Sequence, residues 1–226
     1  MTTRINAGLF DMDGTLIDSE PFWLEAEMAL VASFGGEWTH EQGLTLVGSG
    51  LWDSATAIQH AGVDLDQAEI IDRLSASVRS RLEQQIPWRP GAREMISQML
   101  EHGLPTALVT MSYRKNALTV ARAMSAELGR EAFGFVIAGD DVEQPKPNPE
   151  AYLRAAEALG VDVNQSVAFE DSVFGAAAAY SSGALTIGIP LHIDIPDTYV
   201  HSRWDSMEHK TLDDIEREWQ RREDAG

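Results

Sequence analysis

Two carboxylates two residues apart, Asp11 and Asp13, are the residues of this chain best placed to do chemistry. They directly follow an apolar run at residues 5–10. If that run is a buried strand, both acids emerge at its carboxyl end, where an open α/β sheet places its ligand crevice. Gly14 then allows a sharp turn, so both acids can face one small volume. Alone, the pair is equally typical of an ordinary turn, because Asp and Gly are common where strands end.

Other polar residues lie at comparable places and could act as partners for these acids. Thr110 ends one apolar run, and Glu170 and Asp171 follow another. Lys146 stands between prolines in a loop ahead of a predicted helix. Since the carboxyl ends of parallel strands share one edge of a sheet, we expect all these groups to converge there.

Such a convergence of acids requires a cation. Two carboxylates about 4 Å apart repel each other by roughly 4 kcal/mol at an effective dielectric constant of 20. An all-oxygen set without cysteine or a histidine pair suits Mg²⁺, which uses few carboxylates together with substrate phosphate. Lys146 would then be a point charge near a phosphate. Thr110 and the backbone N–H groups after it could hold the remaining phosphate oxygens.

The elements that must position these residues alternate between strands and helices, which predicts an α/β fold with a Rossmann-like parallel sheet and helices on both faces. Asn148 and Pro149 are expected to open one helix, as a capping residue followed by proline at the first helical position. The predicted strands are 5–10, 105–110, 135–138, 165–169 and 184–189, and the predicted helices are 92–102, 113–128, 148–160 and 172–182.

Residues 18–86 differ from this alternation because their apolar spacing is helical throughout and glycine or proline interrupts it at intervals. We therefore predict an inserted helical-bundle cap at 18–86 and an α/β core at 1–17 and 87–226. Near the end, Leu212, Ile215 and Trp219 form one apolar stripe on a charged helix. That stripe should dock on the core or on a partner.

In order and spacing, four short motifs resemble those of the haloacid dehalogenase (HAD) superfamily and span nearly the whole predicted core. The helical insertion after the first motif resembles the small cap of the subfamily that includes β-phosphoglucomutase and many sugar-phosphate phosphatases. One motif would be weak evidence, whereas four in order are specific. The motifs are Asp11-Met12-Asp13-Gly14-Thr15, Thr110 in Val109-Thr110-Met111-Ser112, Lys146 in Lys146-Pro147-Asn148-Pro149, and Glu170-Asp171 in Phe169-Glu170-Asp171-Ser172.

The resemblance implies a phosphoryl transfer with a role for each matching residue. Asp11 would be the nucleophile that becomes an aspartyl phosphate, and Asp13 the general acid and then general base. Mg²⁺ would be held by Asp11, the main-chain carbonyl of Asp13, Asp171 and Glu170, the last directly or through water. The phosphoryl oxygens would be bound by Thr110, the Met111 amide and Lys146.

Within the family we favour a phosphatase that hydrolyses a small phosphomonoester, because a dehalogenase needs no acid at Asp13. The alternatives are a sugar phosphomutase and a non-catalytic phosphate or metal sensor. In the mutase branch, a cap histidine and an arginine hold the sugar phosphate, whereas the matching stretches here carry Trp23 and Trp52 and no basic group. These tryptophans either face the substrate or fill the cap core. Arg114 and Lys115 either reach the distal part of the substrate or form a solvated helix start.

Composition narrows the range of partners. The chain has 226 residues, 44% of them hydrophobic, and a formal net charge of -19, so a nucleic-acid backbone or an anionic membrane would be repelled. It has no cysteine, and its start lacks the apolar block of a signal peptide. We expect a cytoplasmic protein that binds a small phosphorylated metabolite. Its oligomeric state is open, with a monomer or weak dimer expected.

Overall fold

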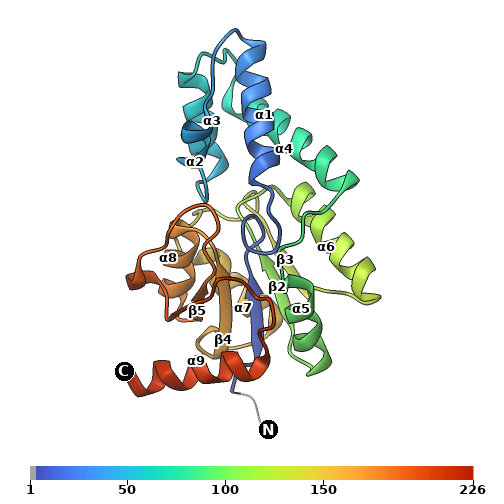
Figure 1. Ribbon diagram of the computed structural model, residues 1–226, viewed down its shortest axis with the longest axis vertical. Helices are drawn as coiled ribbons and strands as arrows, with labels where there is room; N and C mark the ends of the chain where they lie inside the picture. The colour runs from blue at the N-terminus through green and yellow to red at the C-terminus, as the bar shows by residue number, and fades with distance from the viewer. Residues whose placement is uncertain (1–3, 226) are drawn as a thin grey trace.

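A parallel β-sheet forms the centre of the molecule (Figure 1). This computed structural model describes residues 4–225. In spatial order the six strands are β3 (Phe135–Ile137), β2 (Thr106–Val109), β1 (Ala7–Phe10), β4 (Ser166–Glu170), β5 (Leu185–Gly188) and β6 (Ser202–Arg203). Every pairing is parallel, and all residues of β1, β2, β4 and β5 are buried, as their apolar composition requires in a sheet covered on both faces. The predicted α/β class is confirmed.

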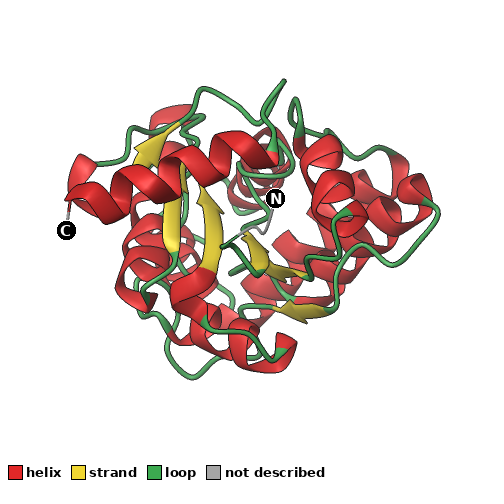
Figure 2. Cartoon of the chain, turned by 90° about the horizontal axis from the view of Figure 1, so that it is seen from below, coloured by secondary structure: helices red, strands yellow, loops and turns green. Residues whose placement is uncertain are grey.

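Helices cover both faces of the sheet (Figure 2). α5 (Ala92–Glu101), α6 (Arg114–Leu128) and α9 (Leu212–Ala225) share a hydrophobic cluster with one face, and α7 (Glu150–Leu159) and α8 (Val173–Ser182) share a second cluster with the other. The alternation of a strand explains this division, because Leu9 belongs to the second cluster and its neighbour Phe10 to the first. On α9, Ile215 and Trp219 are buried, so the predicted apolar stripe docks on the core.

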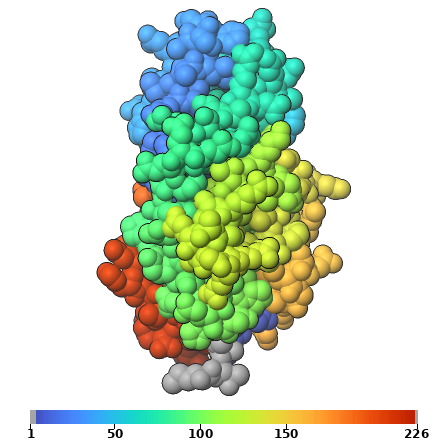
Figure 3. Space-filling model, turned by 90° about the vertical axis from the view of Figure 1, so that its right-hand side faces the viewer, coloured from blue at the N-terminus to red at the C-terminus, as the bar shows by residue number. Residues whose placement is uncertain are grey.

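Four helices stand between β1 and α5, namely α1 (Glu20–Ser33), α2 (His40–Leu44), α3 (Leu51–His60) and α4 (Gln67–Gln84). They pack on one another at one end of the molecule, beyond the carboxyl ends of the strands (Figures 1 and 3). The buried face of α4 carries apolar residues at helical spacing, namely Ile70, Ile71, Leu74, Val78 and Leu82. The helical insertion is thus confirmed. No helix in the described part of the chain is long and apolar enough to cross a membrane.

Two segments of the chain connect the inserted helices to the sheet, one before α1 and one after α4. They run side by side. Ile17 and Trp88 form an isolated β-bridge. The Asp18 amide donates to the Pro87 carbonyl at 2.9 Å, and the Arg89 amide donates to the Leu16 carbonyl at 2.9 Å. The entry to and exit from the insertion are therefore joined by main-chain hydrogen bonds.

Three details of the predicted elements are wrong. β6 was not expected, because it has two residues and no apolar run. α7 begins one residue later than predicted, with Pro149 at the N-cap, while the Asn148 side chain accepts a hydrogen bond from the Glu150 amide at 3.0 Å. α4 ends at Gln84, so the helical spacing predicted to run to residue 86 stops two residues earlier. Pro87 accounts for this end, because the residue before a proline is disfavoured in helical conformation. The short 3-10 helices η1 (Val163–Gln165) and η2 (Asp197–Tyr199) complete the fold.

Candidate active site

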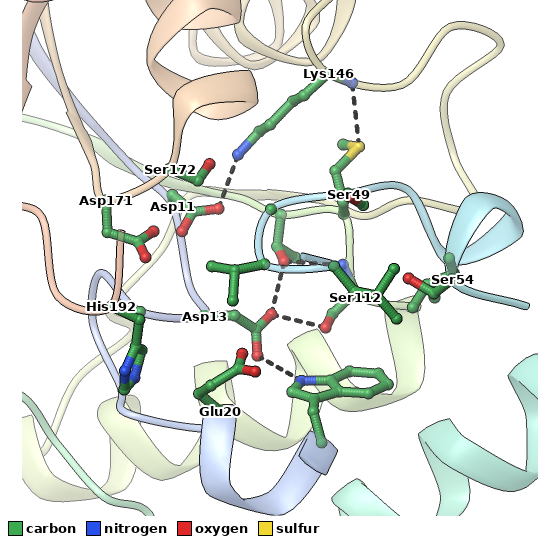
Figure 4. Close-up of a pocket in the computed structure, with 18 of the residues that line it drawn as sticks. Asp11, Asp13, Glu20, Ser49, Ser54, Ser112, Lys146, Asp171, Ser172 and His192 are labelled. Atoms are coloured by element: carbon green, nitrogen blue, oxygen red, sulfur yellow. Dashed lines mark hydrogen bonds and ion pairs between the residues drawn. The ribbon is translucent and has the colours of Figure 1, made fainter. Parts of the chain in front are cut away.

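The carboxyl ends of the strands enclose a cavity of ≈ 90 Å³ beneath the inserted helices. Asp11 and Asp13 follow β1, Thr110 follows β2, and Asp171 follows β4, as predicted. Lys146 reaches the same place from the loop before α7 (Figure 4). Glu170 is the last residue of β4 and is fully buried, outside the cavity lining. The structure therefore brings all the predicted site residues to one edge of the sheet.

Lys146 neutralises two of the buried acids. Its Nζ atom donates to Asp11 Oδ1 at 2.7 Å, to Glu170 Oε1 at 2.6 Å and to the Val109 carbonyl at 2.9 Å. Glu170 Oε1 also accepts from the Tyr152 hydroxyl at 2.5 Å. Burial alone would lower the pKa of Lys146, but the attraction of the two carboxylates outweighs burial and raises that pKa. All three N–H donors of the ammonium group are thus used by protein oxygens, and none is left for a phosphate.

Three carboxylates form a group that could hold a metal ion. Oxygens of Asp11, Glu170 and Asp171 lie within 4.8 Å of one another, and all three residues are buried. Asp171 Oδ1 accepts from the Thr15 hydroxyl at 3.1 Å, whereas Oδ2 is buried and has no hydrogen-bond partner among the described residues. A buried carboxylate oxygen without a partner is costly unless a cation or proton meets it. The donor set is all oxygen, which suits a hard divalent cation.

The backbone and the local charges agree with a cation at this point. Gly14 has φ of 76°, and a Cβ atom there would lie 1.9 Å from Asp171 Oδ2, so only glycine leaves room for that carboxylate. Burial and repulsion by Glu170 raise the pKa of Asp11 to about 7, against the opposing pull of Lys146. Burial and repulsion by Asp11 hold the pKa of Asp171 well above its usual range. The acids carry more negative charge than Lys146 can offset.

Asp13 lies in different surroundings, although it is only two residues from Asp11. Its Oδ1 accepts from the Ser19 hydroxyl at 2.5 Å and from Trp23 Nε1 at 3.3 Å. Its Oδ2 accepts from the hydroxyls of Ser112 at 2.7 Å and Thr110 at 3.3 Å. The Asp13 side chain is therefore outside the three-carboxylate group, and the metal contact predicted for this residue is through its main-chain carbonyl instead. A contact through its main-chain carbonyl stays a prediction.

Thr110 and Met111 line the cavity, as their predicted role requires. Besides its contact with Asp13, Thr110 Oγ1 accepts from the Ser112 amide at 3.0 Å. Met111 Sδ accepts from the Lys146 amide at 3.4 Å. Within residues 4–225 no group accepts a hydrogen bond from the Met111 amide itself. That N–H remains available for an anionic oxygen, and its contact with phosphate stays a prediction.

Of the two tryptophans and two basic residues whose roles the sequence left open, one lines the cavity. Trp23 lines the cavity through its contact with Asp13, whereas Trp52 is 54% exposed and outside the lining. Arg114 Nε donates to Asp141 at 3.0 Å, and Lys115 is exposed at the helix start. Neither basic residue lines the cavity.

Three further titratable residues line the cavity and were not predicted from the sequence. Glu20 and Glu27 come from α1, and His192, from the loop after β5, contacts Asp18 Oδ1 through Nε2 at 2.9 Å. Burial, followed by repulsion from Glu27 and Asp13, raises the pKa of Glu20 to about 8. Burial raises the pKa of Glu27 to about 7. The available signal was the seven-residue spacing of the two acids, which places them on one face of a helix whose buried side is otherwise apolar.

The fold and the site together are those of an α/β enzyme whose buried acidic group could hold a metal ion. More specifically, the chain belongs to the haloacid dehalogenase-like hydrolase family, whose model matches residues 9–189. The family expected from the four motifs is thus confirmed, and with it the hydrolase class.

Individual relatives agree with this assignment over most of the chain. Hexitol phosphatase B of Escherichia coli (strain K12) is 32% identical over 190 residues, which are 83% of this chain and 84% of that protein. Fructose-1-phosphate phosphatase YqaB of the same strain is 34% identical over 194 residues, 84% of this chain and 100% of its own length. Among solved structures, CbbY from Rhodobacter sphaeroides in complex with phosphate superposes with a TM-score of 0.81 at 27% identity, covering 91% of this chain and 96% of that one.

Proposed function

We propose that this protein is a metal-dependent phosphatase that hydrolyses a small phosphomonoester of a sugar or polyol. The observation that carries the proposal is the placement of Asp11 on the cavity wall, with one oxygen held by Lys146 and with Glu170 and Asp171 close to it. The hexitol and fructose-1-phosphate phosphatases that match most of the chain support the substrate class.

Asp11 is the proposed nucleophile. Lys146 fixes Oδ1, whereas Oδ2 accepts no hydrogen bond from the described residues and can attack. A bond forms between this oxygen and phosphorus while the bond from phosphorus to the alcohol oxygen breaks, which leaves an aspartyl phosphate. The Thr110 hydroxyl and the Met111 amide would bind the phosphoryl oxygens, and Lys146 would add its positive charge nearby.

Asp13 is the proposed proton shuttle. Its contacts with Ser19 and Ser112 hold its carboxyl group on the cavity wall next to the inserted helices. There it would give a proton to the departing alkoxide and then take one from water. The hydroxide formed attacks phosphorus, releases inorganic phosphate and restores the Asp11 carboxylate.

Asp11, Asp171 and Glu170, together with the main-chain carbonyl of Asp13, would hold Mg²⁺. The ion would neutralise the charge of the phosphoryl group when bound. The partnerless Oδ2 atom of Asp171 and the space left by Gly14 support this assignment.

Residues 18–86 are the proposed cap, and residues 1–17 and 87–226 the proposed core. The paired connections at Asp18 and residues 87–90 are the proposed hinge. In its closed position the cap would exclude water from the phosphoryl group. The loop between α2 and α3 supports this role, since its residues 47–49 form part of the cavity wall.

We further propose a cytoplasmic location and a monomeric or weakly dimeric state. A chain without cysteine forms no disulfide bonds, which fits a reducing compartment. Sedimentation of the purified protein over a range of concentrations tests the second point.

Phosphate release tests the function. With Mg²⁺, the protein should release phosphate from hexitol phosphate and fructose 1-phosphate, and EDTA should stop the release. Asp13→Asn should lower kcat by at least about 100-fold, since the proton transfer is lost. Asp64→Asn, on an exposed acid away from the cavity, is the matched control.

Two other results would identify the alternatives. Conversion of a hexose 1-phosphate to the 6-phosphate without net phosphate release would indicate a mutase. Binding of phosphate and Mg²⁺ without turnover of any substrate would indicate a sensor.

A further inference from the structure

The wall of the cavity that faces away from the sheet is acidic. Glu20 and Glu27 lie seven residues apart on α1, and both line the cavity. In Figure 4 the Glu20 carboxyl group points toward Asp13 and the middle of the pocket. These two acids take no part in the phosphoryl transfer proposed above, so their presence needs another explanation.

Both acids have oxygens that the protein leaves without partners. Within the described part of the chain, the Glu20 carboxyl group makes no hydrogen bond and no ion pair. Glu27 is 4% exposed, and its Oε2 accepts from Trp38 Nε1 at 2.8 Å, but no described group donates to its other oxygen. A carboxyl oxygen of a cavity-lining residue that has no protein partner is a site for a ligand donor.

Positive charge is scarce in the same cavity. Among the described lining residues there is no arginine, and Lys146 is the single lysine. All three of its donors are used by Asp11, Glu170 and Val109, as described above. His192 contacts Asp18. The charge of the phosphoryl group undergoing transfer would be neutralised by the metal ion. A second anionic group on the substrate would instead lie next to carboxyl groups.

We propose that Glu20 and Glu27 form a recognition wall that binds hydroxyl groups of the alcohol part of the substrate and rejects substrates with a second anionic group. A carboxyl group accepts hydrogen bonds from hydroxyls when ionised and can also donate one when protonated, and neither form offers positive charge. The wall thus selects a neutral, hydroxylated alcohol part. This inference rests on the proposed phosphatase function and specifies its substrate class.

Fructose 1-phosphate and fructose 1,6-bisphosphate form a matched pair, because they differ by one phosphate. We expect the wild-type protein to favour the monophosphate in kcat/KM by about 100-fold or more, since a second dianion would lie beside uncompensated acids. The comparison is made at a pH above the raised pKa values of Glu20 and Glu27, where both acids are ionised. There Glu20→Gln and Glu27→Gln remove the charge at almost constant size, and each should reduce the preference for the monophosphate by about 10-fold. Glu25→Gln is the control, because Glu25 is on the same helix but pairs with Arg81 outside the cavity.

The hydroxyl contact has its own comparison. p-Nitrophenyl phosphate carries no hydroxyl on its alcohol part. Glu20→Ala should therefore lower the kcat/KM ratio of fructose 1-phosphate to p-nitrophenyl phosphate by about 10-fold, the size of one hydrogen bond to a charged group. Glu25→Ala should leave that ratio as in the wild type.

The outcomes separate the two proposals. A wild-type protein that hydrolyses p-nitrophenyl phosphate but accepts mono- and bisphosphate equally would overturn the recognition wall and leave the phosphatase intact. The wall is equally overturned if the Glu20 variants shift neither ratio relative to the Glu25 variants. Absence of phosphate release from all three substrates would instead contradict the phosphatase function, and the wall would fall with it.

Discussion

Lys146 connects stability and function at the scale of single residues. It is 5% exposed and contacts both the proposed nucleophile Asp11 and the acid Glu170. Without an ion, it is the main compensation for the three buried carboxylates. The lysine and a bound cation would therefore neutralise the same three carboxylates, and loss of either should leave more of their negative charge to the other.

Replacement of Lys146 by methionine tests this relation. We expect Lys146→Met to lower the free energy of unfolding in EDTA by about 3–5 kcal/mol, because buried charges lose their partner. Saturating Mg²⁺ should restore more stability to this variant than it adds to the wild type. Urea unfolding with EDTA and with Mg²⁺ measures both quantities.

Lys115→Met is the matched control, because Lys115 is an exposed lysine on α6. It should change stability by less than about 0.5 kcal/mol. Equal stabilities of the two variants would show that Lys146 does not compensate the acids.

Sequence predicted these residues well and their contacts less well. Asp11, Lys146 and Asp171 could be located because strand ends and motifs fix their positions along the chain. The hydrogen bonds that hold the Asp13 carboxylate apart from Asp11 could not be predicted. They depend on the Ser19 and Ser112 hydroxyls, whose directions follow from the folded backbone.

At the scale of elements, the loop between α2 and α3 brings the inserted helices against the core. Gly48 has φ of 76°, and a Cβ atom at this position would lie 2.5 Å from the Ser172 Cβ atom at the start of α8. Gly50 approaches Pro145, next to Lys146, with a Cβ distance of 3.8 Å. At position 48 only glycine permits this close approach, whereas a Cβ atom at position 50 would make an ordinary contact.

A side chain at Gly48 should hold the loop away from the core. We expect Gly48→Ala to lower kcat/KM by about 10-fold or more, because small displacements of a closing element disturb the reacting geometry. Gly35→Ala is the control, since Gly35 has φ of 80° with nothing within 4 Å of its Cβ position.

Stability separates the clash from backbone strain in this experiment. Both alanine variants are destabilised by about 1–2 kcal/mol because alanine is strained in the left-handed backbone conformation. Only the Gly48 variant also clashes with Ser172. Thermal unfolding should therefore show a loss of stability in both variants. Steady-state kinetics should show a loss of activity in the Gly48 variant alone. Equal activity of the two variants would contradict the closing role.

Elements whose signal is local were predictable, and those that depend on tertiary context were not. Buried strands such as β1 and β4 stand out as apolar runs. β6 owes its pairing to β5 and has no pattern of its own. Likewise Glu20 and Glu27 look like a solvated face of α1 until the neighbouring loop and α4 enclose them.

At the scale of the whole molecule, charge opposes the proposed substrate. The formal net charge is -19, and a phosphomonoester is also anionic. Long-range repulsion should slow encounter, and salt should screen it. The acidic surface thus leaves binding to the local site, where a cation and backbone donors act at short range.

Salt dependence follows from this balance. At fixed saturating Mg²⁺, raising KCl from about 20 to 200 mM should increase kcat/KM for fructose 1-phosphate by about 2- to 5-fold, through screening. Steady-state kinetics measures the change, with sucrose as an uncharged control for solvent effects. A fall in kcat/KM with salt would mean that local positive charge dominates the encounter.

Transfer of the phosphoryl group to Asp11 is the central claim, and trapping it tests that claim most directly. The protein is mixed with Mg²⁺ and fructose 1-phosphate that carries a radiolabelled phosphate, and is then quenched with acid during turnover. The label should remain on the peptide that contains Asp11, and Asp11→Asn should neither retain label nor release phosphate. Wild-type turnover by Asp11→Asn, or label on another peptide, would contradict the mechanism.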